Sequence, residues 1–125
     1  MIAAALAAAF VLTSPAFQNG DRIPVRYSCD GANVSPALRW TAPPRGTTAL
    51  SLTVFDPDAP GGGFLHWRIA KMAASKRSLP TGSPGWTGPC PPSGPAHHYV
   101  FTLRALGAKG KVLASARLIG TFKRS

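Results

Sequence analysis

The sequence predicts a mainly all-β fold with few short helices, because turn residues are frequent and the segments between them are strand-like. The 125 residues include 13 Gly and 13 Pro, and the intervening segments are rich in Val, Ile, Leu, Thr, Phe, Tyr and Trp. Short runs of this composition, bounded by turn residues, are typical of strands. No long helix is indicated, and residues 105–115 can hold at most a short one. A chain of this length suits one domain with one core.

The clearest candidate strand is residues 49–55. Leu50, Leu52 and Val54 occupy alternate positions there, with less apolar residues mostly between them. Such alternation marks a strand with one well-buried face. All the candidate strands are 25–29, 38–40, 49–55, 66–72, 99–106 and 117–122.

Two loops rich in Pro and Gly separate neighbouring candidate strands. Residues 56–63 read DPDAPGGG, and residues 79–95 contain six prolines among 17 positions. Pro removes a backbone donor and Gly permits positive φ, so no helix or central strand can continue through either segment. Loops at the rim of a sheet commonly carry binding sites.

Titratable side chains gather where these loops meet the strands. Asp56 and His66 flank the first loop, and His97 and Tyr99 follow the second. Because two separate loop-to-strand junctions supply these groups, we expect the four of them to form one site at the rim of the sheet.

The neighbouring Asp58 and His98 are explained without a ligand. An Asp beside a proline commonly caps a turn, and Asp58 follows Pro57. We expect Asp58 to cap that turn and His98 to face solvent on its strand.

The charge balance favours anionic partners. Fourteen Lys and Arg face four Asp, with no Glu, for a formal net charge of +10. The basic residues are scattered singly, so dedicated nucleic-acid binding is not expected.

No Glu, HExxH or GxSxG pattern is present to support catalysis, and we expect neither an enzyme nor a cofactor. The alternative is a hydrolase that uses Asp56, His66 and His97 with a metal, or Ser93.

Two features bear on the cellular compartment. Residues 2–12 form an apolar run that is too short to span a bilayer and resembles the core of a signal peptide, although no Lys or Arg precedes it. We expect a signal-peptide-like segment over 1–11, a domain over 12–125, and a periplasmic or secreted protein; a shortened start on a cytoplasmic protein is the alternative. Cys29 and Cys90 match no zinc spacing, so no metal is expected; they can pair after export or stay thiols in the cytosol.

Several segments, in the correct order, resemble the phosphatidylethanolamine-binding protein family. The segments DPDAPGGGFLHW (56–67) and GPCPPSGPAHHYVFTLRAL (88–106) resemble its two signature segments. RIPVRYSCDGANVSPALRW (22–40) is similar to its opening segment, and LIGTFKRS (118–125) to its closing strand. Such an ordered set is far more specific than one short pattern. The likeness is greatest to the small bacterial, Raf-kinase-inhibitor-like branch.

This resemblance implies a β-sandwich-like fold with a pocket for phosphate, phosphoryl head groups or acetate-like anions. It further implies that the protein modulates or inhibits another protein, as relatives linked to kinases or proteases do. Imidazole and phenol groups donate hydrogen bonds to anionic oxygens, and a carboxylate can orient an imidazole. The residues that match the family's pocket and its wall are Asp56, Pro57, Pro60, His66, His97 and Tyr99.

The chain departs from the family pattern in two places. Ala96 is an insertion before His97, and the stretch from 106 to 117 lacks a longer, partly helical insertion that is usual in the family. The resemblance also places Cys29 near Cys90, because each matched segment has a Cys beside a turn. A disulfide is expected if the protein is exported, with two separately buried thiols as the alternative.

Overall fold

The structure, a computed structural model, describes residues 9–125, so most of the apolar segment expected over 1–11 lies outside the described residues. Neither short helix in this part of the chain is long and apolar enough to cross a membrane. The elements are β1 (Leu12–Thr13), η1 (Val25–Tyr27), β2 (Leu38–Trp40), β3 (Ala49–Asp56), β4 (Phe64–Ala73), β5 (Ser78–Leu79), β6 (His97–Leu106), η2 (Ala108–Gly110) and β7 (Val112–Phe122), where η marks a 3-10 helix.

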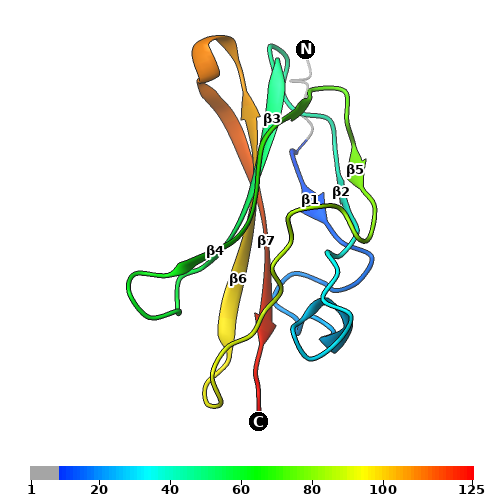
Figure 1. Ribbon diagram of the computed structural model, residues 1–125. Coiled ribbons are helices and arrows are strands. Elements are labelled where there is room, and N and C mark those ends of the chain that lie inside the picture. Colours follow the sequence, from blue (N-terminus) through cyan, green and yellow to red (C-terminus); the bar gives the residue numbers. More distant parts are fainter. Residues whose placement is uncertain (1–8) are drawn as a thin grey trace, which may run out of the picture.

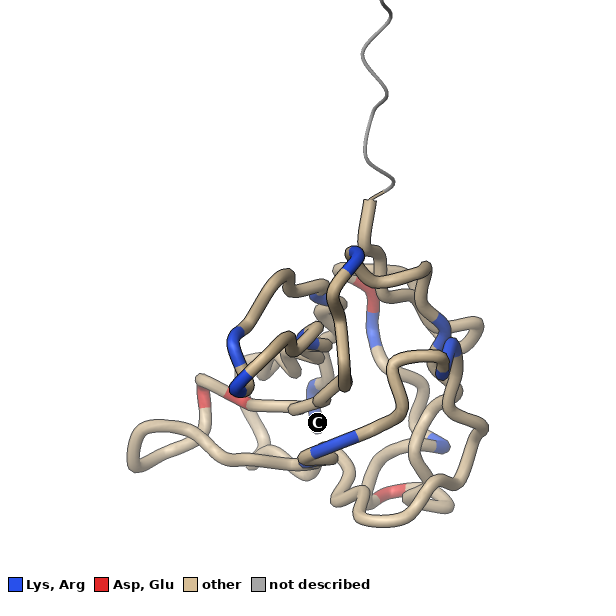
Figure 2. The backbone as a smooth tube through the Cα atoms, turned by 90° about the horizontal axis from the view of Figure 1, so that it is seen from above, with Lys and Arg blue, Asp and Glu red and all other residues tan. Residues whose placement is uncertain are grey.

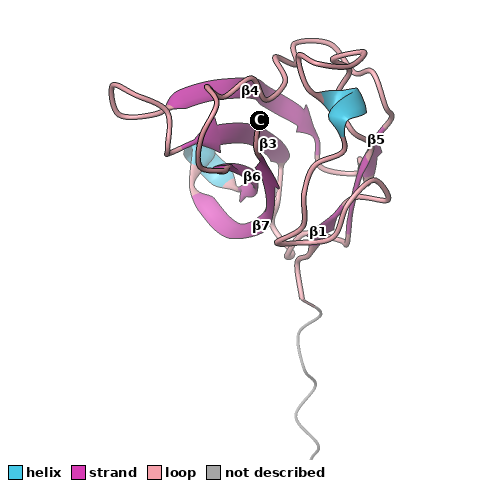
Figure 3. Cartoon of the chain, turned by 90° about the horizontal axis from the view of Figure 1, so that it is seen from below, coloured by secondary structure: helices cyan, strands magenta, loops and turns pink. Residues whose placement is uncertain are grey.

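The strands form two antiparallel sheets (Figure 1). The larger sheet has the strand order β4-β3-β6-β7, and the smaller has the order β1-β2-β5. Seen from below in Figure 3, the larger sheet curls, and β1 and β5 lie to one side of it. This architecture confirms the mainly β, sandwich-like fold class.

The core lies between the two sheets and follows from the alternation in β3. Leu50, Leu52 and Val54 point inward and are completely buried. They share a hydrophobic cluster with Leu38 and Trp40 of the smaller sheet. Complete burial of such a side chain contributes about 1.5–3 kcal/mol, so this stripe of apolar residues accounts for the way in which the sheets pair.

The prediction of a strand over residues 25–29 is wrong. These residues form η1 and a bend, in which the Tyr27 N–H donates to the Pro24 carbonyl at 3.1 Å and the Ser28 N–H to the Val25 carbonyl at 3.0 Å. Pro24, with φ of −58°, is preorganised for this turn. The β propensity of Val25 and Tyr27 has no effect here because no neighbouring strand is available to pair with them.

The other predicted strands are confirmed, the one over 38–40 with the same ends and the rest with changed ends. β7 begins at Val112 and pairs with β6 through most of its length. The connection is a tight turn in which the Gly107 N–H donates to the Lys111 carbonyl at 2.7 Å, with Lys109 at a φ of +58°. The only helix within 105–115 is the three-residue η2, as the sequence predicts.

Basic residues are distributed over the whole surface of the described chain. Figure 2 shows Lys and Arg positions on many sides of the fold, with few acidic positions between them. A surface of this kind attracts anions without selecting a particular one.

Candidate functional site

The ends of three strands of the larger sheet meet at one edge. Asp56, the last residue of β3, pairs with Phe64, the first residue of β4. On the other side of β3, Phe55 pairs with Val100 of β6, which places His97 beside the end of β3. The strand-end residues that the sequence singled out are therefore close together in space.

A β-bulge in β4 turns two consecutive side chains inward. The pairing moves from Val54 with Trp67 to Phe55 with Leu65, so β4 contains one extra residue, His66. His66 and Trp67 are both buried, with 7% and 1% of their surfaces exposed. In a regular strand such neighbours point to opposite faces, so the bulge explains why His66 reaches the interior.

A cavity of about 300 Å³ lies between this edge and the proline-rich loop before β6. Its lining combines a few polar groups with apolar walls, as is usual for small-molecule sites. The lining residues are Asp56, Ala59, Pro60, Phe64, His66, Thr87, Gly88, Cys90, Pro91, Pro92, His97 and Tyr99.

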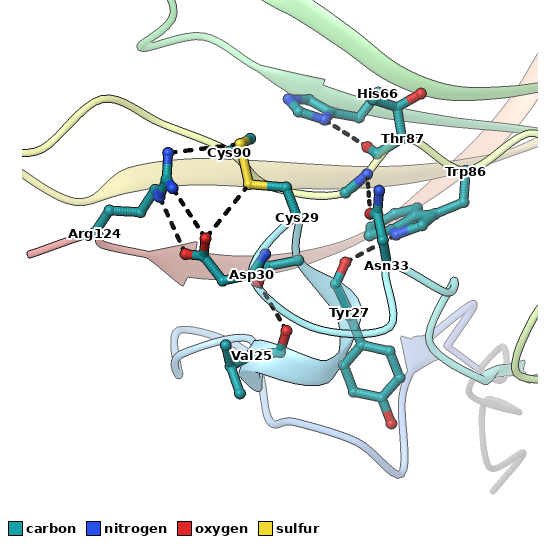
Figure 4. The surroundings of a disulfide bond; sticks show 12 residues. Val25, Tyr27, Cys29, Asp30, Asn33, His66, Trp86, Thr87, Cys90 and Arg124 are labelled. Atoms are coloured by element: carbon teal, nitrogen blue, oxygen red, sulfur yellow. Dashed lines mark hydrogen bonds and ion pairs between the residues drawn. A yellow bond between two sulfur atoms is a disulfide. The ribbon is translucent and has the colours of Figure 1, made fainter.

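The loop that forms one wall of the cavity is held by the segment around η1 (Figure 4). Trp86 Nε1 donates to the Tyr27 carbonyl, and the Gly88 N–H donates to Asn33 Oδ1, both at 2.9 Å. A side chain at Gly88 would collide with Asn33 and with the Tyr27 backbone, so only glycine fits there. The turn at η1 thus positions a wall that is about 60 residues away in the sequence.

A disulfide between Cys29 and Cys90 fixes the same wall (Figure 4). Its S–S distance is 2.00 Å, and the two Cα atoms are 5.4 Å apart. Beside it, Arg124 donates from Nε and Nη2 to the carboxylate of Asp30, at 3.0 and 2.9 Å. Because Cys90 also lines the cavity, this covalent link limits how far the wall can move.

Asp56 is held from two directions. His97 Nδ1 lies 2.7 Å from Asp56 Oδ2, and the Asp58 backbone N–H donates to Asp56 Oδ1 at 2.8 Å. Only 3% of the Asp56 surface is exposed. Since each carboxylate oxygen already has a partner, Asp56 orients the His97 imidazole and leaves Nε2 as its free ring nitrogen.

His66 is fixed by a backbone carbonyl. Its Nδ1 lies 2.6 Å from the Thr87 carbonyl oxygen, which can only accept, so Nδ1 carries the proton of the neutral ring and Nε2 is unprotonated. Burial lowers the pKa of His66 below its usual value, and the bond to Thr87 opposes this only in part. Neutral His66 therefore offers Nε2 as an acceptor.

Tyr99 contributes a phenol without a partner. The residue is completely buried, and its hydroxyl makes no hydrogen bond within the described chain. Burial raises its pKa above the usual value, and the negative charges of Asp56 and Asp58 act in the same direction. The hydroxyl therefore keeps its proton and remains a donor. A buried polar group of this kind calls for an explanation.

Five of the six expected site residues line the cavity, and Pro57 does not. Pro57 lies on the opposite face of the larger sheet, beside Phe55 and Leu65. β3 ends at Asp56, and the chain turns outward at the next residue. The assignment of Pro57 to the pocket wall is therefore corrected, whereas Pro60 is part of the wall.

Ser93, which the hydrolase alternative names, lies away from the cavity. The Ser93 hydroxyl donates to the Ser125 carbonyl at 2.9 Å, and Ser93 does not line the cavity. Between residues 9 and 125, no group of three or more His, Cys, Asp or Glu side chains is arranged to hold a metal ion.

Asp58 and His98 form a second pair that the sequence analysis missed. Asp58 Oδ2 accepts from the His98 backbone N–H at 2.8 Å and lies 2.7 Å from His98 Nδ1. The side-chain and backbone hydrogen bonds from His98 lower the pKa of Asp58. The expectation that His98 faces solvent is confirmed. Asp58 lies in the turn after β3, as expected, but its side chain also forms hydrogen bonds with His98 of β6.

Sequence reasoning also missed most of the loop residues in the cavity wall. Thr87, Gly88, Pro91 and Pro92 lie there because residues near η1 hold the loop. The density of proline predicts a loop of defined conformation. Which of its residues face the cavity depends on contacts with residues that are distant in the sequence.

Comparisons with known proteins agree with this architecture. The family profile described as phosphatidylethanolamine-binding protein matches residues 13–123. The chain is 39% identical to the UPF0098 protein Mb1945c of Mycobacterium bovis, over 90% of this chain and 69% of that protein. It is 44% identical to LppC of Mycobacterium tuberculosis, whose name describes a candidate lipoprotein, over 74% of this chain but only 53% of LppC.

Solved structures show the same fold. The chain superposes on a phosphatidylethanolamine-binding protein homologue, CT736 of Chlamydia trachomatis, with a TM-score of 0.85 and 31% identity, covering 94% of this chain and 99% of that one. Escherichia coli YbcL also gives a TM-score of 0.85, at 26% identity, with 94% and 100% covered.

The fold and the cavity define a two-sheet β protein with a small site at the rim of the larger sheet. The profile match spans nearly the whole chain, and the relatives and structures agree with it. The chain therefore belongs to the phosphatidylethanolamine-binding protein family, together with bacterial members such as YbcL.

Proposed function

We propose that this protein binds a small phosphate-type oxyanion, free or as a phosphoryl head group, in the cavity at the end of β3. The observation that carries the proposal is the Tyr99 hydroxyl, which is completely buried and has no partner within residues 9–125. Leaving a buried donor unpaired costs about 1–3 kcal/mol. A ligand oxygen that accepts from Tyr99 would remove this cost.

The two imidazoles extend the same site. His66 and His97 both use Nδ1 for protein partners, Thr87 and Asp56, and keep Nε2 for a ligand. A hydrogen phosphate group can accept from Tyr99 and donate its remaining proton to neutral His66. Binding that instead protonates His66 gives the anion a charge-assisted hydrogen bond.

The rest of the cavity suits an organic group attached to the anion. Its volume of about 300 Å³ is at the lower end of the range for small-molecule sites. Phe64, Pro91 and Pro92 provide apolar surface in its wall. The net charge of +10 attracts anions to the surface from which they enter.

We further propose that the protein acts by binding rather than catalysis, and outside the cytoplasm. Modulation of a partner such as a kinase or a protease, and membership of the Raf-kinase-inhibitor-like branch, stay proposals that rest on the family alone. The disulfide favours an oxidising compartment. The candidate lipoprotein status in the name of LppC is consistent with such a location.

The test is a titration of inorganic phosphate and of phosphoethanolamine, followed by NMR, into the wild type and a Tyr99→Phe variant. We expect Tyr99→Phe to weaken binding about tenfold, because it removes one hydrogen bond to a charged ligand. Tyr27→Phe is the matched control, since Tyr27 is the other tyrosine and lies outside the cavity lining. Equal affinities for all three proteins would refute the proposal.

A further inference from the structure

The outer face of the larger sheet carries no other element of the described chain. In Figure 1 the smaller sheet lies on one side of this sheet, and the loop after β3 projects on the other side. Side chains alternate between the two faces of a strand, so the residues of β3 that do not enter the core, such as Thr53 and Phe55, belong to this outer face.

Two rows of side chains cross the outer face. Phe55 pairs with Leu65 on one side and with Val100 on the other, which makes an apolar row. One step along the strands, Thr53 lies opposite Arg68 and Thr102. Thr102 in turn pairs with Arg117, so this second row ends in an arginine at each edge of the sheet.

The rows enclose a hollow of about 340 Å³. Thr102 lies at its floor with only 5% of its surface exposed, whereas Phe55 and Leu65 are 38% and 47% exposed. The lining residues are Thr53, Phe55, Pro57, Leu65, Val100, Thr102, Arg104 and Arg117. The hollow thus has an apolar half and a cationic half.

The arginines of this face have no carboxylate partner within the described residues, 9–125. Three of the four Asp residues are engaged elsewhere: Asp56 with His97, Asp58 with His98, and Asp30 with Arg124. Within residues 9–125, Arg104 donates to the Thr53 hydroxyl at 3.0 Å, and neither Arg68 nor Arg117 forms an ion pair.

We propose that this hollow, built from Phe55, Leu65, Val100, Arg104 and Arg117, binds an acidic segment of a partner protein. An apolar side chain of the segment lies against Phe55 and Leu65, and its carboxylates pair with Arg104 and Arg117. Aromatic and Arg residues are the types that most often dominate such interfaces. This surface is on the face opposite to the cavity and is independent of the anion site.

The occupant is neither a second copy of this chain nor a membrane. A second copy carries the same +10 charge and offers only Asp21 outside an ion pair, so it has no acidic segment to contribute. A bilayer is flat, whereas the apolar side chains here line a hollow flanked by the projecting loop (Figure 1). A chain segment can enter such a hollow.

The test uses a synthetic peptide in which Glu residues flank a Leu-Phe centre, and a matched peptide with Gln in place of Glu. Binding is followed by NMR on the full chain and on two double variants of equal charge change, Arg104→Gln/Arg117→Gln and Lys109→Gln/Lys111→Gln. We expect the Glu peptide to shift the signals of Phe55, Leu65 and Val100. We expect about tenfold weaker binding for the arginine variant, which loses two charge-assisted contacts, and less than about twofold for the lysine variant.

Three outcomes would overturn the proposal. The first is equal loss of binding in both double variants, which would mean diffuse electrostatic attraction. The second is a Glu peptide that binds no better than the Gln peptide or leaves these signals unchanged. The third is binding to phosphatidylserine vesicles that depends on Arg104 and Arg117 while no peptide binds, which would mark a lipid surface. Thermal unfolding of both variants verifies that each is folded.

Discussion

The rim of the larger sheet contains two Asp–His pairs of equal length in very different surroundings. His97 Nδ1 lies 2.7 Å from Asp56, and His98 Nδ1 lies 2.7 Å from Asp58. The side chains of the first pair are 12% and 4% exposed, and those of the second are 55% and 41% exposed. The same chemistry therefore orients an imidazole that lines the cavity inside the fold and links a loop to a strand outside it.

The difference arises from strand geometry. His97 and His98 are consecutive, so their side chains leave β6 on opposite faces. Asp56 and Asp58 are separated by Pro57, where β3 has ended and the chain turns outward. Two contacts of the same length thus contribute differently to stability, because water screens the outer pair much more than the inner one.

The largest effect is expected for removal of the inner carboxylate. Asp56→Ala should lower the free energy of unfolding by about 3 kcal/mol, because it removes a buried carboxylate and leaves His97 Nδ1 and the Asp58 backbone N–H without their partner. Asp58→Ala, the matched outer change, should cost less than about 1 kcal/mol. Urea unfolding at neutral pH measures both, and equal losses would show that burial does not separate the pairs.

The next effect concerns the proposed ligand. His97→Ala should weaken phosphate binding by roughly 1.5–3 kcal/mol if its hydrogen bond is charge-assisted, and His98→Ala should change it little. Calorimetric titration of phosphate into both variants provides the comparison. A similar loss in both would place the anion on the general basic surface.

A smaller effect is expected from pH. Burial lowers the pKa of His66, and a bound anion favours its protonated form, so binding should take up protons. Affinity for phosphate should therefore rise as pH falls from about 8 to about 6. Calorimetry in buffers of different ionisation enthalpy measures the proton uptake. Affinity that is constant with pH in the wild type would contradict this role of His66.

The smallest effect belongs to the outer pair at acidic pH. The pKa of Asp58 is lowered by the hydrogen bonds from His98, so the pair contributes stability above the unfolded-state pKa of Asp, about 3.9. That contribution should disappear as pH falls through the lower pKa of the folded state. An Asp58→Asn variant should lack this part of the acid unfolding profile, and identical profiles would argue against the outer pair.

Local sequence patterns predicted the fold correctly where the alternation of side chains within one strand shows which face is buried. The alternation of Leu50, Leu52 and Val54 determines the buried face of β3 directly, and the order of the matched segments indicated the family. The strand prediction for residues 25–29 was wrong because β propensity leads to a strand only when a partner strand is present. Here Pro24 favours a local turn instead.

The sequence predicted which residues gather at the candidate site, but not how their side chains are oriented there. Asp56, His66, His97 and Tyr99 all line the cavity, yet the inward position of His66 depends on a bulge that is defined only by pairing with β3. Pro57, which the resemblance places in the pocket wall, lies beside Phe55 and Leu65 instead, because β3 ends at Asp56 and the chain then turns outward. These features depend on register and on contacts distant in the sequence, which no local pattern contains.

The disulfide makes part of the polypeptide a closed ring. Joining Cys29 to Cys90 closes a covalent ring that contains β2, β3, β4 and β5, including the exposed glycine-rich loop at 61–63. Exposed loop tips of small residues are the preferred positions of proteolytic nicking. A protease that cuts there opens the ring but leaves both pieces covalently joined, with Asp56 on one piece and His66 and His97 on the other. The nicked protein should therefore migrate as one species until it is reduced.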